Sequence, residues 1–242
     1  MNLTPYYDRD GITLYLGRCE DVLPQIGLVD AIITDPPYNI GTPQLITFDN
    51  HGQARQRREV GKDFGVFDEG AVGPETWMPI ARSTLKEGGV IVSFYGAKAM
   101  ERLLTADKDL QVIQDFHWIK PAPAVPMRSV GFSWGTESGY IFRRAGEKHK
   151  HNNDAGISPN WFLTHRCSNN EMVGHPTQKP FELARWLVNH WSFPDQTICD
   201  PFLGSGTFAV AAKDLGRRCI GIEINEGYLK IAIERLRQGV LL

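Results

Sequence analysis

The sequence is poor in cysteine, and its few cysteines are not arranged in pairs. Four occur in 242 residues, and no two of them form a CxxC motif: Cys19, Cys167, Cys199 and Cys219. Zinc knuckles usually need such pairs and disulfide frameworks occur mainly in secreted chains, so we expect four reduced thiols. One group of histidines and a cysteine has the composition of a metal site, but its spacing matches no zinc pattern and we predict no metal: His149, His151, His165, Cys167 and His175.

Long apolar runs are also missing. The longest apolar stretch, residues 88–97, is far shorter than the roughly 20 residues that cross a bilayer. The opening MNLTPYYDRD has neither the basic region nor the apolar region of a secretion signal. We therefore expect no membrane anchor and a cytoplasmic protein.

An excess of basic charge is missing as well. The chain has 26 Lys and Arg against 28 Asp and Glu, so its surface as a whole is not a general binder of nucleic acid. Disorder is excluded for the bulk of the chain because 42% of the residues are hydrophobic and only 22% are charged. Repeats and low-complexity tracts are absent. The length fits a single domain over residues 1–242.

Short β-rich runs alternate with helical stretches, which predicts an α/β fold with a doubly wound, mostly parallel sheet. Bounded by Gly, Pro or Asp, the seven expected strands are Ile12–Leu16, Val29–Thr34, Gly89–Tyr95, Val112–Ile119, Ser138–Arg143, Thr197–Asp200 and Arg218–Glu223. The expected crossover helices are Pro74–Lys86, Ala97–Ala106, Lys179–Trp191, Gly206–Leu215 and Glu226–Arg237.

Two long segments, 39–73 and 144–174, match neither pattern, and loops of this length in a compact domain usually serve a function. Basic residues outnumber acidic ones by four to two in Asn39–Lys62, and by four to one in RRAGEKHKH, at the start of the second segment. A solvated charged surface is the simpler explanation on charge alone, and a nucleic-acid surface is the alternative. The candidate phosphate or base contacts are Arg55, Arg57, Arg58, Arg143, Arg144, Lys148 and Lys150.

The stretch VDAIITDPPYN places a polar turn at the end of a buried-looking strand. Open α/β sheets bind ligands at this carboxyl edge, to which the strand delivers Asp35, Pro36, Pro37 and Tyr38. The prolines cannot donate backbone hydrogen bonds, so the turn is rigid and its carbonyls stay free as acceptors. A carboxylate, a carbonyl and an aromatic ring together suit a planar group that carries an exocyclic amine. An ordinary strand-ending turn explains the same residues.

The stretch TICDPFLGSGTFAVAAKDLGRRCIGIEINEGY predicts a strand, a glycine-rich turn, a helix, a second strand and a terminal acid. Gly204 and Gly206 allow a ligand to approach the backbone at the start of the helix. The spacing is GSGT rather than GxGxxG, which disfavours a dinucleotide. Glu223 ends the second strand at about the offset from which an acid reaches ribose hydroxyls. An adenosine-containing ligand without a pyrophosphate fits best, while a tight turn with Glu223 capping the next helix remains open.

Three motifs in one chain resemble those of the S-adenosylmethionine-dependent DNA amino-methyltransferases. They are DPPY at 35–38, HPTQKP at 175–180 and DPFLGSGT at 200–207. Their order is similar to that of the β group of this family, with the target-recognition region between the halves. Weaker similarity covers nearly the whole chain: LYLGRCEDVL, TLKEGGVIVSF, and the pattern Trp118, Lys120, Glu137. The resemblance implies a Rossmann-like seven-stranded sheet with a small target-recognition insertion, and segments 39–73 and 144–174 as probable DNA contacts.

The resemblance also implies which residues hold the cofactor, S-adenosylmethionine. Phe202 and the GSGT turn would surround its methionine part, Glu223 its ribose, and Thr177 and Lys179 its carboxylate. Lys179 would equally suit a helix start with a solvated tip. Where the family usually has an acid, this chain has Gly17-Arg18-Cys19, so Cys19 would contribute through its backbone. The full set is Cys19, Thr177, Lys179, Asp200, Phe202, Gly204, Ser205, Gly206, Thr207 and Glu223.

By the same resemblance, the chain is expected to methylate the N6 amine of adenine in duplex DNA after flipping the base. The catalytic residues would be Asp35, Pro36, Pro37 and Tyr38. The N4 amine of cytosine is the nearest alternative, since DPPY favours adenine only because SPPY is the commoner cytosine form. A catalytically silent module that binds cofactor and DNA is the alternative of a different class. Double-stranded DNA is the expected partner, and a homodimer and a cognate restriction endonuclease stay open.

Overall fold

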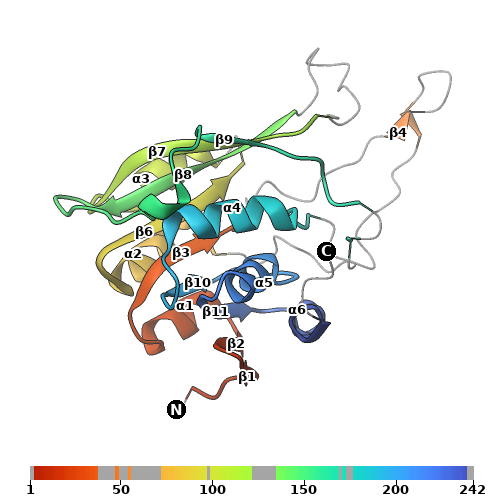
Figure 1. Cartoon of the computed structure of the whole chain (residues 1–242), viewed down its shortest axis with the longest axis horizontal. Coiled ribbons are helices and arrows are strands. Elements are labelled where there is room, and N and C mark those ends of the chain that lie inside the picture. The colour runs from red at the N-terminus through yellow and green to blue at the C-terminus, as the bar shows by residue number, and fades with distance from the viewer. Residues whose placement is uncertain are drawn as a thin grey trace.

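The computed structural model describes residues 3–37, 47–48, 54–55, 72–96, 99–121, 135–168, 171–172 and 177–238. Within them, one large sheet is covered by helices on both sides (Figure 1). A separate two-stranded ribbon pairs β4 (Thr47–Phe48) with β5 (Ala54–Arg55). Apart from that ribbon and residues 72–73, the predicted segment 39–73 lies outside the described residues.

The large sheet has nine strands in the order β1-β2-β11-β10-β3-β6-β8-β7-β9. The pairs from β2 through β6 are all parallel, and β8 runs antiparallel to both of its neighbours. The strands are β1 (Tyr7–Arg9), β2 (Ile12–Leu16), β3 (Val29–Thr34), β6 (Leu85–Tyr95), β7 (Leu110–Ile119), β8 (Thr136–Arg144), β9 (Trp161–Leu163), β10 (Thr197–Asp200) and β11 (Arg218–Glu223).

Six α-helices and two short 3-10 helices connect the strands in the described part of the chain. The α-helices are α1 (Cys19–Val22), α2 (Pro74–Ser83), α3 (Met100–Thr105), α4 (Phe181–Trp191), α5 (Thr207–Asp214) and α6 (Glu226–Gln238). The 3-10 helices are η1 (Leu23–Gln25) and η2 (Asn153–Ala155). None of the described helices is long and apolar enough to cross a membrane.

The doubly wound α/β prediction is confirmed, but the predicted number of seven strands is wrong. All seven expected strands are present, and β1 and β9 are added at the two ends of the sheet. Each has only three residues, too few for a period of two to stand out in the sequence. Strand β6 also begins at Leu85 rather than at Gly89, because α2 ends at Ser83 and the chain enters the sheet at once.

Side chains of the central strands alternate between two hydrophobic cores, one on each face of the sheet. Ala31 and Ile33 of β3 point into the core covered by α4, α5 and α6. Ile32 points into the core covered by α1 and α2. Strand β3 is therefore buried on both faces, as is usual for a central parallel strand. Its carboxyl end is held rigidly between β10 and β6.

Candidate active site

Asp35 directly follows β3, at the carboxyl edge where neighbouring parallel strands also end. The backbone register aligns Thr34, the residue before it, with Ser93 near the end of β6. Pro36 is buried and Pro37 is half-buried, so the start of the turn packs into the protein. Tyr38 lies outside the described residues. The structure therefore places the first three residues of the DPPY motif where the sequence predicted them.

Lys179 approaches this turn from the chain that leads into α4, and its ammonium forms an ion pair with Asp35 Oδ2. The same nitrogen lies 3.2 Å from Oε2 of Glu137, near the start of β8. The other carboxylate oxygen of Glu137 pairs with Lys120, which follows β7. Asp35, Lys179, Glu137 and Lys120 thus form a continuous row of alternating charges, which we call the charge row.

Both lysines of the charge row are buried, with 6% of the Lys179 side chain and 4% of the Lys120 side chain exposed. Burial lowers the pKa of Lys179, but Asp35 and Glu137 outweigh this effect and the pKa lies above its ordinary value. Burial likewise raises the pKa of Glu137, and the two lysines reverse the shift, so the pKa is lowered. Lys179 and Glu137 are therefore both charged near neutral pH.

The glycine-rich turn between β10 and α5 needs its two glycines for conformational reasons. Gly204 and Gly206 both have positive φ, 52° and 80°, a region that favours glycine. A Cβ at position 206 would also come within 2.7 Å of Ala232 Cβ on α6. The turn leaves the amino end of α5 at the carboxyl edge, where Ser205 and Thr207 are buried. Phe202 flanks it and packs edge-on against Trp77, with ring centroids 5.5 Å apart.

Glu223 ends β11 and braces the same turn. Its Oε2 accepts a hydrogen bond from Gly204 N at 2.7 Å, and its Oε1 accepts one from Asn225 N at 2.8 Å. Only 9% of the residue is exposed, and no ion pair joins it to a cation among the described residues. Burial raises the pKa of Glu223, although the backbone donors oppose the shift. A buried carboxylate with spare lone pairs suits a ligand that brings hydroxyl groups or positive charge.

Asp200 lies behind the turn, with 1% of the residue exposed. Its Oδ1 accepts hydrogen bonds from Thr34 Oγ1 at 2.7 Å and from Phe202 N at 3.2 Å. It therefore ties the end of β3 to the start of the glycine-rich turn. The sequence grouped Asp200 with the cofactor contacts, and its burial makes it a residue that positions the turn.

The Asp200→Asn variant is expected to change how stability depends on pH. Burial raises the pKa of Asp200 to about 7, so folding favours its protonated form. The stability that this group contributes is fully present below its unfolded pKa near 4. It is lost as the pH rises through its folded pKa of about 7, by up to ~1.4 kcal/mol per pH unit. Asparagine removes that loss, so the variant should gain stability over the parent at pH 8 but not at pH 4. Urea unfolding at both values measures the difference, and equal gains at both would contradict the assignment.

Arg235 was not found by sequence reasoning, yet it holds the glycine-rich turn from α6. Its Nη1 donates to Ser205 O at 2.8 Å, to Ser205 Oγ at 3.2 Å and to Thr207 Oγ1 at 3.0 Å. Burial lowers the pKa of Arg235. Nothing in the pattern of α6 marks this arginine, because charged residues at neighbouring positions of the helix face solvent.

The remaining predicted cofactor residues lie at the rim of this edge. The backbone N–H of Gly17 donates to Glu223 O at 2.9 Å, which brings the turn before α1 next to the end of β11. Cys19 is buried there, and burial raises the pKa of its thiol. Thr177 is exposed, whereas Gln178 and Lys179, which follow it, are buried.

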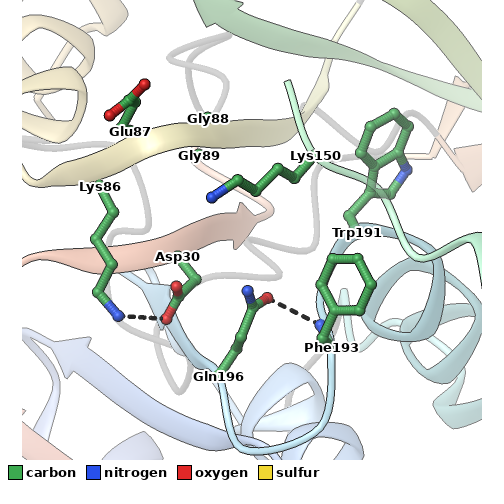
Figure 2. A pocket seen from close by; sticks show the side chains of 9 residues that line it. All are labelled: Asp30, Lys86, Glu87, Gly88, Gly89, Lys150, Trp191, Phe193 and Gln196. Carbon is green, nitrogen blue, oxygen red and sulfur yellow. Dashed lines mark hydrogen bonds and ion pairs between the residues drawn. The ribbon is translucent and has the colours of Figure 1, made fainter. Parts of the chain in front are cut away.

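Four of the predicted DNA contacts lie at the opposite, amino edge of the sheet. Arg143 pairs in register with Val90, early in β6, and Lys150 N donates to Gly88 O at 3.0 Å. Figure 2 shows the Lys150 side chain reaching past Gly88 and Gly89 into a pocket, where Lys86 pairs with Asp30 at 2.8 Å. Lys148 lies in the same segment. The chain that connects β8 to η2 loops out on the side of the sheet away from the carboxyl ends of β3 and β6 (Figure 1).

Arg144 binds backbone carbonyls near the end of α2 at this amino edge. Its guanidinium donates to Arg82 O at 2.9 Å, to Lys86 O at 3.3 Å and to Leu85 O, and so closes the end of α2. The sequence suggested a phosphate contact, and the structure gives these donors to backbone carbonyls instead. Arg57 and Arg58 lie outside the described residues, and of Arg55 only the backbone is described.

A basic residue that the sequence analysis did not select lies at the carboxyl edge. Arg166 and His165 follow β9 and are both exposed. Strand β9 runs parallel to β7, which ends at Ile119 next to Lys120 of the charge row. Arg166 forms no ion pair with another described residue. The only signal for Arg166 in the sequence is its position in segment 144–174, one of the two segments expected to contact DNA.

Two of the histidines that suggested a metal site, His149 and His151, make ring contacts. His149 and His151 lie with centroids 5.7 Å apart, and Trp191 is 6.1 Å and 6.3 Å from them. Across the described ranges, no three His, Cys, Asp or Glu side chains gather as metal ligands. His175 is outside those ranges. All four cysteines are described and are free thiols.

Comparison with known proteins gives matches over most of the chain. The family model described as DNA methylase, for N6 and N4 enzymes, matches residues 29–234. The type II methyltransferase M2.LlaDCHI of Lactococcus lactis subsp. cremoris is 27% identical, covering 97% of this chain and 93% of the relative. The type II methyltransferase M2.DpnII of Streptococcus pneumoniae is also 27% identical, over 96% of this chain and 92% of the relative.

Solved structures show the same fold. The complex of M1.HpyAVI with S-adenosylmethionine superposes with a TM-score of 0.71 at 24% identity, covering 93% of this chain and 98% of that one. PvuII DNA methyltransferase, titled cytosine-N4-specific, gives a TM-score of 0.70 at 18% identity, with 96% and 88% covered. The two TM-scores are nearly equal, and the family model includes both N6 and N4 enzymes, so the fold does not distinguish target bases.

Proposed function

The chain belongs to the DNA methylase family of N6 and N4 enzymes, and on that premise we propose that it methylates the N6 amine of adenine in duplex DNA. It is an S-adenosylmethionine-dependent DNA methyltransferase, and the target base is the part that we propose. The observation that carries the choice is the carboxylate of Asp35 in the first position of the DPPY motif, at the carboxyl edge beside the glycine-rich turn. By resemblance, the adenine enzymes favour Asp at this position.

The residues at the carboxyl edge fit S-adenosylmethionine. The buried, cation-free carboxylate of Glu223 suits the ribose hydroxyls, and Gly204 and Gly206 let the ligand approach the backbone. Ser205 and Thr207 are fixed by Arg235, so this part of the wall is preformed. When bound, the cofactor would supply a methyl group attached to a sulfonium, whose sulfur leaves as a neutral thioether.

Asp35 and Pro36 would act on the target amine. An amine attached to a purine ring is a poor nucleophile because its lone pair is delocalised. The Asp35 carboxylate and the Pro36 carbonyl accept its two N–H groups, which favours the more nucleophilic, pyramidal form and offsets the positive charge that develops on nitrogen. After transfer, Asp35 or water accepts the proton that the methylated amine releases.

The target base must leave the duplex to reach this edge, at a cost of a few kcal/mol. We propose that Tyr38, adjacent to Pro37, stacks on the flipped base. The two prolines hold the backbone before Tyr38 rigid, which lowers the entropy lost when the base binds. Arg166 and His165, exposed at the same edge, would contact the flanking phosphates.

Arg166 and Arg144 are expected to respond differently when replaced by alanine. Arg166→Ala should lower the slope of log K against log salt by about one unit, because one phosphate contact is lost. Arg144→Ala should leave the slope unchanged but destabilise the fold by roughly 1.5–3 kcal/mol, since its charged hydrogen bonds close α2. Fluorescence anisotropy at several salt concentrations and urea unfolding measure both effects. A lower salt slope with unchanged stability in Arg144→Ala, and an unchanged slope in Arg166→Ala, would assign the phosphate contact to Arg144.

Expression in a methylation-deficient bacterial strain, followed by genome sequencing with modified-base detection, tests the proposed function. Methylated adenines in a recurrent motif are expected, and they would also give the recognition site. Methylated cytosine N4 would keep the mechanism and correct the base. No modification by folded protein that still binds S-adenosylmethionine would favour a silent DNA-binding module.

A further inference from the structure

The charge row joins the DPPY turn to the part of the chain around residues 120–137. Its two inner members are Lys179 and Glu137, and Lys179 is shared between two carboxylates. Lys120 pairs with the far side of Glu137 and lies 4.5 Å from the centroid of the Trp118 ring. None of these contacts requires cofactor or DNA, so the row is already built in the protein alone.

We propose that Glu137 is a positioning residue for methyl transfer, which shares Lys179 with Asp35 and so sets the direction and the local charge of the carboxylate that accepts the target amine. This proposal rests on the proposed function. Glu137 itself does not touch the reacting atoms. It acts through Lys179.

The argument is one of charge balance. A lysine facing Asp35 alone would neutralise it, and its positive charge would oppose the charge that develops on the amine. Glu137 on the other side of the ammonium balances Lys179, so Asp35 is oriented by an ion pair and still presents net negative charge to the substrate. Because Lys179 is buried, solvent screens this effect little.

The remaining contacts fix Glu137 itself. Glu137 lies opposite Trp118 in the β7–β8 register, and the Trp118 indole N–H donates to Thr164 O at 2.9 Å. Lys179 in turn lies 4.8 Å from the centroid of the Phe94 ring, near the end of β6. Buried ion pairs add little to stability relative to apolar packing. The orientation and net charge that the charge row gives to Asp35 therefore explain its presence at this edge better than a gain in stability does.

The decisive variant is Glu137→Gln, which keeps the shape and removes the charge. We expect kcat to fall about 10- to 100-fold, as for a slightly misplaced catalytic group, with KM for S-adenosylmethionine and for DNA unchanged. Glu137→Asp restores the charge and should recover most of kcat. Titration with S-adenosylmethionine gives the concentration of folded protein, so kcat is compared per folded molecule even where a variant is less stable.

The pH profile separates a charge effect from a structural one. In Glu137→Gln, Lys179 faces Asp35 alone, so the acidic limb of the kcat profile should move to lower pH. In Lys179→Gln, Asp35 and Glu137 lose their shared cation, and the limb should move to higher pH. Asp200, a titratable carboxyl that interacts electrostatically with Asp35, is the same in both variants. A merely structural role would not shift the limb in opposite directions.

The matched control is Lys86→Gln, at the amino end of β6. Lys86 pairs with Asp30 of β3 at 2.8 Å, at the amino edge shown in Figure 2, and should leave kcat unchanged. Parent-like kcat in Glu137→Gln, or equal losses in Glu137→Gln and Glu137→Asp, would overturn the positioning role while the proposed function stands. A parent protein that methylates no duplex would overturn both.

Discussion

Asp35→Ala should lose methyl transfer by ~10³-fold or more while it still binds S-adenosylmethionine and DNA. The reason is that the carboxylate acts chiefly in the transition state, where it meets the positive charge on the amine, and removing one such preorganised group costs two to three orders of magnitude in kcat. A single-turnover assay with tritiated cofactor measures the chemical step directly. Calorimetry with S-adenosylmethionine and anisotropy with a duplex measure the two binding steps.

Asp35→Ala also removes one of the two carboxylates that pair with the buried Lys179, so a neutral isostere is needed as a second variant. Asp35→Asn keeps a carbonyl acceptor and should retain more activity than alanine, though far less than the parent. Asp30→Asn is the matched control, because Asp30 lies at the amino end of β3, whereas Asp35 directly follows the carboxyl end of the same strand. Undiminished transfer by folded Asp35→Ala would show that the carboxylate is not the acceptor.

Glu223→Ala is the second variant from which we expect a large effect. It should weaken S-adenosylmethionine binding about 100-fold, because it removes the acceptor for the ribose hydroxyls and leaves the backbone N–H groups of Gly204 and Asn225 without their partner. Isothermal titration calorimetry gives the dissociation constant. DNA binding without cofactor should be unaffected.

Glu223→Gln keeps acceptor oxygen and shape, so its loss of affinity should be much smaller. Glu226, three residues further on, is an exposed acid that pairs with Tyr6 and Lys230, and Glu226→Gln serves as the control. If Glu223→Ala bound cofactor as tightly as the parent does, Glu223 would only hold the glycine-rich turn in place and would not contact the cofactor.

The strand-end motifs could be predicted from the sequence because their positions follow from local rules. A buried run that ends in DPPY, and a strand that ends in DPFLGSGT, put Asp35 and the glycine-rich turn at one edge of any doubly wound sheet. The seven longer strands were found for the same reason. The three-residue strands β1 and β9 were not, because they exist through pairing with neighbours rather than through their own pattern.

Side-chain partners far apart in the sequence could not be predicted in this way. Lys179 was assigned to a cofactor contact or to a solvated helix start, and only the folded chain shows that it meets Asp35 and Glu137. The sequence shows that the loop after β8 is basic, but not at which edge of the sheet this loop lies. The turn from β8 carries Arg144 and Lys150 to the amino edge, where they bind backbone carbonyls and line a pocket.

The sheet order has a consequence for how activity arises during synthesis. Strands β2 and β3 are made early but are not neighbours, because β11 and β10, among the last elements to be made, lie between them. Asp35 and Lys179 are 144 residues apart, so the nascent chain carries the DPPY motif long before it has a partner. Such non-local pairings form late and slowly. A fragment that stops before β10 should therefore be inert, and adding the missing C-terminal piece as a separate peptide offers a way to switch methylation on by complementation.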